Sequence, residues 1–160
     1  MKTSTTADPL ADPLALERQV CFALAVASRN VIALYRPILE PMGLTHPQYL
    51  VMLALWGREP LSVKDLSGLI ALDPGTLSPL LKRLEAAGLV TRDRDPRDER
   101  NLAVGLTPKG RALRSQAEKV PPAIVERLGL PIAELERLHA ALTTVIAAAG
   151  SAGTAESAAP

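Results

Sequence analysis

The sequence has 160 residues, of which 48% are hydrophobic and 2% aromatic, and its formal net charge is +1. This length predicts about one domain, and the balanced charge excludes a basic surface spread over the whole chain. The alanine- and leucine-rich composition predicts a mainly α fold. The single cysteine, Cys21, excludes an intramolecular disulfide framework and a zinc site of several cysteines.

Both ends of the chain are small, polar and rich in Gly, Pro or Ala, so residues 1–12 and 150–160 are expected to be disordered tails. The first eleven residues lack the apolar run of a signal peptide. No stretch is expected to approach the length of a membrane span. We therefore expect a cytoplasmic protein with no membrane partner, in a compartment that keeps its thiol reduced.

A long helix is predicted from Pro13 to about Leu39, because apolar and small residues recur there at spacings of three, four and seven. Pro37, Pro41 and Gly43 indicate where it ends. The residues on its repeating face are Leu14, Cys21, Leu24, Ser28, Ile32, Tyr35 and Leu39.

Further helices begin at residues that cap a helix N-terminus. The predicted N-caps are Thr45, Ser62, Asp73 and Thr107. Thr45 and Gln48 form a capping-box pattern. The helix that begins at Asp73 is expected to end at Gly88, which suits a left-handed C-cap. Two closing helices are predicted at 108–128 and 131–149, the last with a narrow apolar seam that suits a partner helix.

Between these helices the apolar period changes from that of a helix to that of a strand. Residues 89–92 and 102–106 are β-prone, and they flank the charged segment 94–100. This pattern predicts a two-stranded hairpin with a charged tip, which must pack on the helices beside it because a lone hairpin is marginal in water.

The element order is helix, short helix, turn, helix and hairpin, which is the order of a winged helix-turn-helix. The helix over 73–87 would enter the major groove, and the arginine-rich hairpin tip would follow an adjacent minor groove. Taken singly, each feature fits a solvated loop or a cap; in this order they favour DNA binding. The candidate DNA-binding residues are Gly75, Thr76, Ser78, Pro79, Lys82, Arg83, Arg94, Arg97 and Arg100.

Residues 74–90 (PGTLSPLLKRLEAAGLV), 95–101 (DPRDERN) and 106–110 (LTPKG) resemble the MarR family of transcriptional regulators. The resemblance covers nearly the whole chain between the tails. It implies a homodimer on a palindromic operator in double-stranded DNA, with dimerisation helices at 13–44 and 108–149 around a winged helix-turn-helix at 45–107. In the family an Asp-x-Arg pattern, matched here by Asp98 and Arg100, orients the arginine that enters the minor groove.

The surroundings of Cys21, together with Tyr35 and the segment 44–49 (LTHPQY), resemble one branch of that family, the one-cysteine organic hydroperoxide repressors. The branch implies that Cys21 forms hydrogen bonds with two tyrosines of the partner subunit and that its oxidation releases DNA. His46 stands where the second tyrosine is expected, and Ala25 where some members carry another. As a cation, His46 would lower the pKa of the thiol.

Cys21 and Tyr35 lie on one helix face, within about 40° of each other, but about 21 Å apart along the axis. They can meet only across a dimer. Peroxide would oxidise the Cys21 thiolate to a sulfenic acid. Because the sequence has no second cysteine, a small cellular thiol would then form a mixed disulfide, shift the helices and break the register with the operator half-sites.

Two other interpretations remain open. The first is a MarR-type repressor released by a small aromatic or phenolic ligand, with Cys21 as a structural core residue, as lone cysteines often are. The second is a thiol peroxidase, which the lack of a resolving cysteine and of a Thr/Arg neighbourhood around Cys21 disfavours. We expect no enzymatic activity, no cofactor and no metal.

Overall fold

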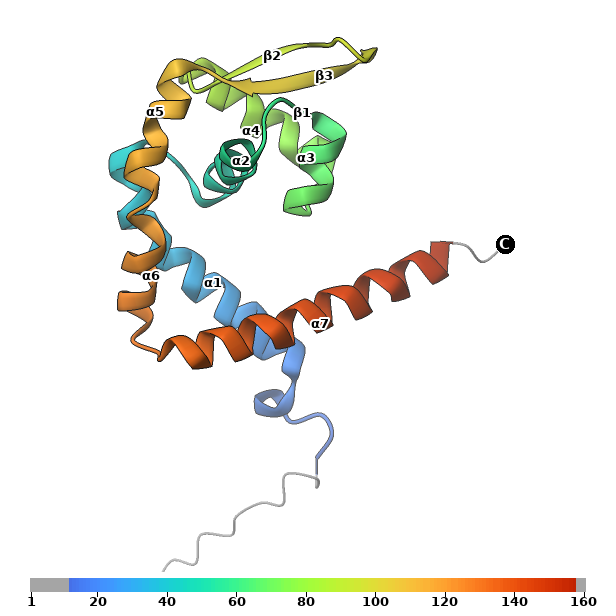
Figure 1. Cartoon of the computed structure of the whole chain (residues 1–160). Helices are drawn as coiled ribbons and strands as arrows, with labels where there is room; N and C mark the ends of the chain where they lie inside the picture. Colours follow the sequence, from blue (N-terminus) through green and yellow to red (C-terminus); the bar gives the residue numbers. More distant parts are fainter. Residues whose placement is uncertain (1–11, 158–160) are drawn as a thin grey trace, which may run out of the picture. The chain divides into compact units, whose positions relative to one another are not determined.

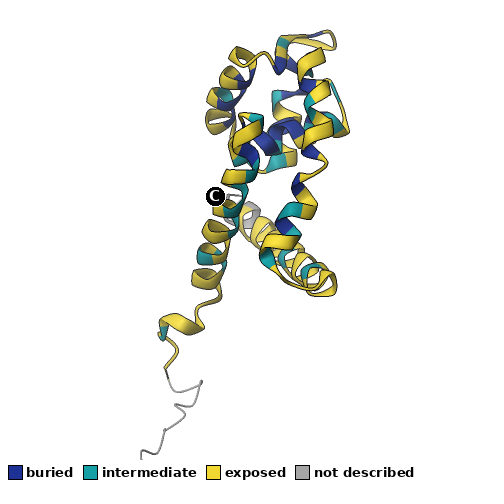
Figure 2. Ribbon diagram, turned by 90° about the vertical axis from the view of Figure 1, so that its left-hand side faces the viewer, coloured by how far each residue is buried: buried dark blue, intermediate teal, exposed yellow. Residues whose placement is uncertain are grey.

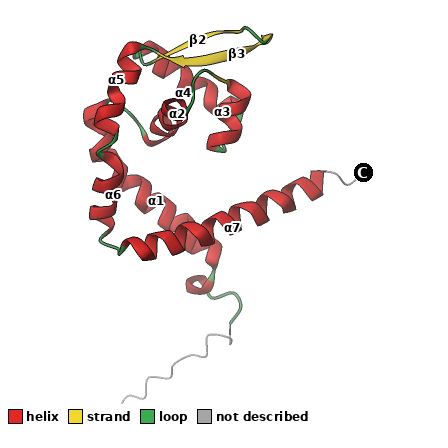
Figure 3. Cartoon of the chain, in the orientation of Figure 1, coloured by secondary structure: helices red, strands yellow, loops and turns green. Residues whose placement is uncertain are grey.

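The computed structural model describes residues 12–157 and is mainly helical, as predicted (Figures 1 and 3). The chain divides into two compact units, one up to Val120 and one from Pro121. The elements of the first unit are η1 (Leu16–Arg18), α1 (Val20–Leu39), η2 (Glu40–Met42), α2 (His46–Gly57), β1 (Leu61–Ser62), α3 (Val63–Ile70), α4 (Pro74–Ala86), β2 (Val90–Asp95), β3 (Asp98–Leu106) and α5 (Pro108–Ala117). Helix α6 (Val120–Leu128) begins at the boundary, and α7 (Ile132–Ser157) follows it.

The four predicted N-caps are confirmed, each by a side-chain oxygen that accepts a backbone N–H three residues on. Thr45 and Gln48 close the full capping box, since the Gln48 side chain accepts the Thr45 N–H at 2.9 Å. Gly88 adopts the expected left-handed conformation, with φ +73°. These features form because each depends only on residues close in sequence.

The first helix begins later than predicted. Residues 16–18 form a separate 3₁₀ turn, and α1 starts at Val20 because Gln19 is extended, with φ −75° and ψ 111°. The Gln19 side-chain amide donates to the carbonyls of Pro13 and Ala15, which holds this break in place. The predicted tail 1–12 lies outside the described residues except for Asp12.

The predicted hairpin is present, but it belongs to a three-stranded antiparallel sheet in the order β1-β3-β2. Val90 pairs with Leu106 at its base, and the two-residue strand β1 pairs Leu61 with Val104. The prediction of two strands therefore missed β1, since a two-residue strand has too few residues to show a period. The third strand ties the base of the hairpin to the segment between α2 and α3.

The core of the first unit lies among α2, α3, α4 and the base of the sheet (Figure 2). Its fully buried side chains include Met52, Leu55, Leu61, Leu66, Leu77, Leu81, Leu84 and Val104. Helix α5 approaches so closely that a Cβ built on Gly110 would lie 2.1 Å from the Leu89 carbonyl oxygen. The Trp56 indole N–H donates to the Gly110 carbonyl at 2.9 Å, so α2 and α5 are joined at the same residue.

The predicted helix 108–128 is two helices, α5 and α6, with a break at residues 118–119. Pro121 and Pro122 explain the break, because proline lacks the N–H that a continuous helix needs and fits the first turn of a new one. The predicted end of the last helix at Ala149 is also wrong, since α7 continues to Ser157, into the segment predicted as a tail.

Among the described residues, the segment Val20–Met42 is long and apolar enough to cross a membrane, so the expectation that no stretch approaches this length is wrong. The segment meets this criterion by its length and composition only. The segment carries Arg29 and Arg36 and is mostly exposed, with Val20 68% and Phe22 43% accessible.

Candidate DNA-binding surface and sensing site

Helix α4 has one buried face and one exposed face. Leu77, Leu81 and Leu84 pack into the core, and the opposite face leaves candidate DNA-binding residues exposed. The exposed candidates are Gly75, Thr76, Pro79, Lys82 and Arg83, and Ser78 is half-buried. Because these three leucines are buried on one side of α4, the small polar residues and the two cations face outward together.

The first turn of α4 is held by Asp73. Its carboxylate accepts the Thr76 backbone N–H at 3.0 Å and the Thr76 hydroxyl at 2.6 Å. These bonds lower the pKa of Asp73, the Thr76 hydroxyl contributing most. Pro79 lies inside the helix and has no N–H for the Gly75 carbonyl, but Gly75 is exposed, so water can bond that oxygen.

The hairpin tip is ordered by two aspartates. Asp95 is buried and accepts the Arg97 backbone N–H at 2.9 Å, the main cause that lowers its pKa. Asp98 accepts the Arg100 backbone N–H at 3.1 Å and the Asn101 amide at 3.3 Å. Asp98 thus holds the backbone of Arg100, and within residues 12–157 no hydrogen bond joins its carboxylate to the Arg100 guanidinium.

The three arginines of the tip, Arg94, Arg97 and Arg100, are all exposed. Arg97 is 75% exposed even though its Nε lies 3.4 Å from Asp95. Three cations on the outer part of a narrow hairpin form a surface that a phosphate backbone or a minor groove would attract.

The base of the hairpin is fixed by Glu59, which sequence reasoning missed. One carboxylate oxygen accepts the Leu106 backbone N–H, and the other pairs with Arg111 of α5 at 2.6 Å. Burial raises the pKa of Glu59, but these bonds outweigh it and hold the pKa below its ordinary value. No local pattern could reveal this contact, because Glu59 and Leu106 are 47 positions apart.

Of the three predicted sensing residues, the structure brings two together. The rings of Tyr35 and His46 meet edge to face, with centroids 4.7 Å apart, and Tyr49 lies 6.0 Å from Tyr35. Cys21 is exposed, on the same helix as Tyr35 but three to four turns away. Within one chain the thiol therefore does not reach the ring cluster.

The ring cluster is partly buried, which shifts the pKa values of its side chains. Burial raises the pKa of the Tyr35 phenol and lowers the pKa of the His46 imidazole. Burial thus favours the neutral form of the His46 ring. That His46 acts on the Cys21 thiol stays a prediction.

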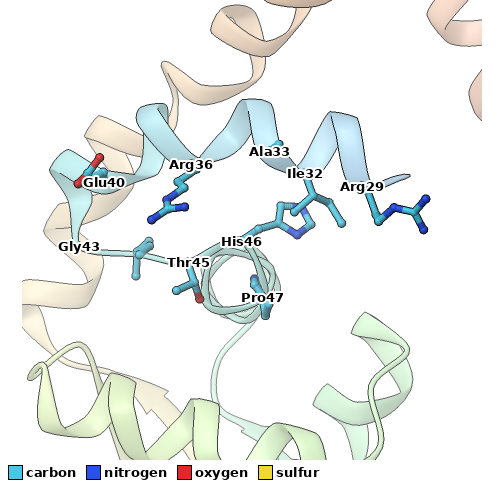
Figure 4. A pocket seen from close by; sticks show the side chains of 10 residues that line it. Arg29, Ile32, Ala33, Arg36, Glu40, Gly43, Thr45, His46 and Pro47 are labelled. Carbon is cyan, nitrogen blue, oxygen red and sulfur yellow. The ribbon is translucent and has the colours of Figure 1, made fainter. Parts of the chain in front are cut away.

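A cavity of about 720 Å³ lies beside this cluster, between the C-terminal half of α1 and the start of α2 (Figure 4). Its lining combines apolar and small residues with two arginines and the His46 ring. The lining residues are Arg29, Ile32, Ala33, Arg36, Glu40, Gly43, Leu44, Thr45, His46 and Pro47. Sequence reasoning did not find this cavity, because it depends on how α1 and α2 pack.

Comparison with known proteins agrees with this architecture. A profile of the MarR family matches residues 44–102. The organic hydroperoxide resistance transcriptional regulator of Bacillus subtilis is 40% identical over 135 residues, covering 84% of this chain and 92% of that protein. The chain belongs to the MarR family of transcriptional regulators.

Two solved MarR-type structures on DNA share the fold. The repressor CouR bound to a 23-mer duplex has a TM-score of 0.75 at 27% identity, covering 82% of this chain and 94% of that one. Reduced AbfR bound to DNA has a TM-score of 0.63 at 36% identity, with the same two coverages. CouR of Rhodococcus jostii has also been solved with p-coumaroyl-CoA, and AbfR in an overoxidised form.

Membership of the MarR family makes this chain a DNA-binding transcriptional regulator and not an enzyme. Regulators of this family bind DNA as dimers. The neighbours include one solved with a small molecule and one solved in an oxidised state, so the family by itself leaves the signal that this MarR regulator senses open.

Proposed function

We propose that this chain is a homodimeric repressor that leaves a palindromic operator when an organic hydroperoxide oxidises Cys21. The observation that carries the proposal is the exposed Cys21 thiol on α1, in a chain 40% identical to an organic hydroperoxide resistance regulator. The Tyr35–His46 ring pair supplies polar atoms for a thiol brought in by a second subunit. Such a regulator acts in the cytoplasm, where its thiol stays reduced.

The chemistry needs one cysteine and two external reactants. The Cys21 thiolate attacks the terminal peroxide oxygen, an S–O bond forms as the O–O bond breaks, and the alcohol leaves with a proton. A small cellular thiol then condenses with the sulfenic acid and releases water, which leaves a mixed disulfide. A bulky adduct on α1 displaces the partner helix and changes the spacing of the two α4 helices.

The DNA-contacting roles follow from the two exposed surfaces described above. In this proposal Gly75, Thr76 and Ser78 approach base edges and phosphates in the major groove, and Lys82 and Arg83 bind phosphates. Arg94, Arg97 and Arg100 follow the minor groove, with Asp98 fixing the backbone of the tip. Residues 45–107 form the DNA-binding part, and the helices of 13–44 and 108–149 form the dimer.

The test is an operator gel shift with wild type, Cys21→Ser and the matched control Ser28→Ala on the same helix. Cumene hydroperoxide should release wild type and Ser28→Ala, whereas Cys21→Ser should stay bound because it has no oxidisable sulfur. Mass spectrometry of oxidised protein incubated with small thiols should find one adduct per chain. Release of Cys21→Ser by the peroxide would refute the sensor role.

The ring pair can be tested separately. Tyr35→Phe removes only the phenol hydroxyl, so we expect slower oxidation of Cys21 with unchanged operator affinity. His46→Tyr places a phenol where the hydroperoxide repressors carry one, and we expect it to speed oxidation. Stopped-flow measurement of thiol loss gives both rates; equal rates in all three proteins would show that the pair does not act on Cys21.

The cavity beside His46 favours a second candidate, a repressor released by a small aromatic ligand. Its volume of about 720 Å³ falls in the range of small-molecule sites. The neighbour CouR, solved with p-coumaroyl-CoA, is a precedent in the family. Release of the Cys21→Ser variant by a non-oxidising aromatic acid would support this candidate in place of the redox switch.

A further inference from the structure

The start of α5 is hydrogen-bonded to the end of α4, the helix proposed to enter the major groove. Three successive carbonyls at that end each accept a bond. The Ala87 carbonyl accepts from the Lys109 ammonium at 3.0 Å, and the Gly88 carbonyl accepts from the Thr107 hydroxyl at 2.6 Å. The Leu89 carbonyl accepts the Thr107 backbone N–H at 3.1 Å. The end of α4 is therefore fixed to α5 at three consecutive residues.

Lys109 is bonded to α4 in the position where a cation stabilises a helix. The carbonyl end of a helix carries partial negative charge, which favours an ammonium that donates to the Ala87 carbonyl. Across residues 12–157, Lys109 belongs to no ion pair, and the side chains of Lys82 and Arg83 on α4 have no hydrogen-bond partner in the protein. Lys109 thus has a protein partner, whereas the two cations of α4 remain available for phosphates.

The next two residues of α5 hold α2 and the base of the hairpin. The Gly110 carbonyl accepts the Trp56 indole N–H at 2.9 Å. Arg111 pairs at 2.6 Å with Glu59, whose other carboxylate oxygen accepts the Leu106 backbone N–H at the end of β3. The chain runs directly from β3 into α5 (Figure 1), so one turn of helix contacts α4, α2 and the hairpin together.

These bonds act at the C-terminal end of α4, whereas its candidate groove residues lie at the other end. A further bond at the same end, from the Arg92 guanidinium of β2 to the Glu85 carboxylate at 2.9 Å, joins α4 to the hairpin directly. Gly75 and Ala86 are eleven residues apart, which is about 16 Å along the axis. A tilt of about 10° at the held end would move the first turn by about 3 Å, close to the rise of one base pair, about 3.4 Å.

We propose that residues 107–111 are a joint that sets the direction of α4 relative to the hairpin and thereby determines how well the protein distinguishes its operator from other DNA. Lys109 and Thr107 are positioning residues, which act on the end of α4 and do not contact DNA. This inference rests on the proposed DNA contacts of α4 and the hairpin. Non-specific DNA needs only phosphate contacts, whereas an operator needs both surfaces in register with its two grooves.

The experiment measures the affinity of the reduced protein for the operator and for a scrambled duplex of the same length and composition, over a range of salt concentrations. Lys109→Met removes the ammonium but keeps the length of the side chain, and Lys109→Arg keeps a donor for the Ala87 carbonyl. Lys82→Met serves as the comparison for a proposed phosphate contact. Lys119→Met is the matched control, because Lys119 is exposed just beyond the other end of α5.

Lys109→Met should weaken operator binding about tenfold, about threefold for each subunit, which is the size expected for one lost hydrogen bond. Its affinity for the scrambled duplex and its salt dependence should stay as in wild type, because no phosphate contact is lost. Lys109→Arg should restore most of the operator affinity. Lys82→Met should weaken binding to both duplexes alike and lower the salt slope by about two per dimer. Lys119→Met should match wild type.

The hairpin side of the joint has its own readout. Arg111→Gln should reduce the protection of the operator minor groove from hydroxyl radicals, while guanines in the major groove stay protected from dimethyl sulfate. Arg114→Gln is the control, because Arg114 pairs only with Glu118 of its own helix turn. Emission from Trp56, the one tryptophan of the chain, together with the unfolding temperature, reports whether the joint stays folded in each variant.

Three results would overturn the joint. One is an equal loss on both duplexes with a lower salt slope in Lys109→Met, which would make Lys109 a phosphate contact. Another is a lower unfolding temperature in Lys109→Met with unchanged operator preference, which would make its role structural only. The third is equal affinity of wild type for both duplexes, which would refute the proposed operator binding as well. Lost preference in Lys109→Met beside an unchanged Lys82→Met would support the joint and refute only the proposed phosphate contact of Lys82.

Discussion

The winged helix-turn-helix part of the chain buries most of its large apolar side chains, whereas helix α7 leaves several of its own exposed. In the first, Leu66, Leu77, Leu81 and Leu84 are at most 1% exposed. In α7, Leu138 is 49% exposed, and Val145 and Ile146 are 44% and 69% exposed. The first part completes its core within one chain, whereas α7 presents an apolar surface of the kind that soluble proteins usually cover with a partner.

This contrast indicates where one chain is sufficient and where a second is required. The candidate DNA-binding residues lie in the part that forms its own core, so their geometry exists in each subunit. The proposed sensing site is different, because Cys21 and Tyr35 are on one helix and do not meet within it. Four changes test this contrast, from the largest expected effect to the smallest.

Leu81→Ala should lower the free energy of unfolding by about 2–5 kcal/mol, because it removes a fully buried side chain from α4 and leaves a cavity. Urea denaturation followed by circular dichroism measures the change. The exposed Leu69→Ala, 63% accessible on α3, is the control and should change the stability little. Similar losses in both variants would mean that the α4 face is not the core of this part.

Leu138→Glu should weaken the dimer about a hundredfold, since it places a charge from each subunit in an apolar interface. Operator binding should weaken in parallel, because two half-sites need two subunits. Analytical ultracentrifugation gives the dimer constant. Ala140→Glu, on the opposite side of α7, is the control; a dimer equally stable in both variants would remove α7 from the interface.

Thr107→Ala should cost about 1–2 kcal/mol of stability, the usual effect of losing an N-cap. The Thr107 hydroxyl accepts the Gly110 N–H at 3.0 Å and donates to the Gly88 carbonyl at 2.6 Å, so it also links α5 to the end of α4. Thr107→Ser keeps both bonds and should restore most of the loss in thermal unfolding. If Thr107→Ser were as unstable as Thr107→Ala, the loss of stability would come from the missing methyl group and not from the hydroxyl.

Glu59→Gln should have the smallest effect, below about 1 kcal/mol at pH 7, because its ion pair with Arg111 is partly exposed. Since folding lowers the pKa of Glu59, the carboxylate stabilises the protein above the ordinary pKa of glutamate. That stabilisation is lost as the pH falls through the lowered value. Unfolding measured from pH 7 to pH 3 should therefore show a weaker pH dependence for Glu59→Gln than for wild type, and identical curves would contradict this role.

The features that the sequence predicted well are those whose causes lie within a few residues. The N-caps Thr45, Ser62, Asp73 and Thr107 bond backbone groups three positions away, and Gly88 ends its helix through its own φ. The order of these elements was enough to predict the mainly helical winged fold and the family. The ends of two helices were predicted wrongly. The break at Gln19 depends on side-chain hydrogen bonds to the backbone, and the new helix before Pro121 depends on proline, and the spacing of apolar residues shows neither.

Only the tertiary structure decided what distant residues do together. Glu59 reaches Leu106 and Trp56 reaches Gly110 across 47 and 54 positions, and no local pattern encodes either contact. The lowered pKa of His46 follows from burial, and the cavity with Arg29 and Arg36 follows from the packing of α1 on α2. Caps and turns are governed by backbone bonds between neighbours, whereas burial, charge state and cavities are properties of surfaces that exist only once the helices are packed.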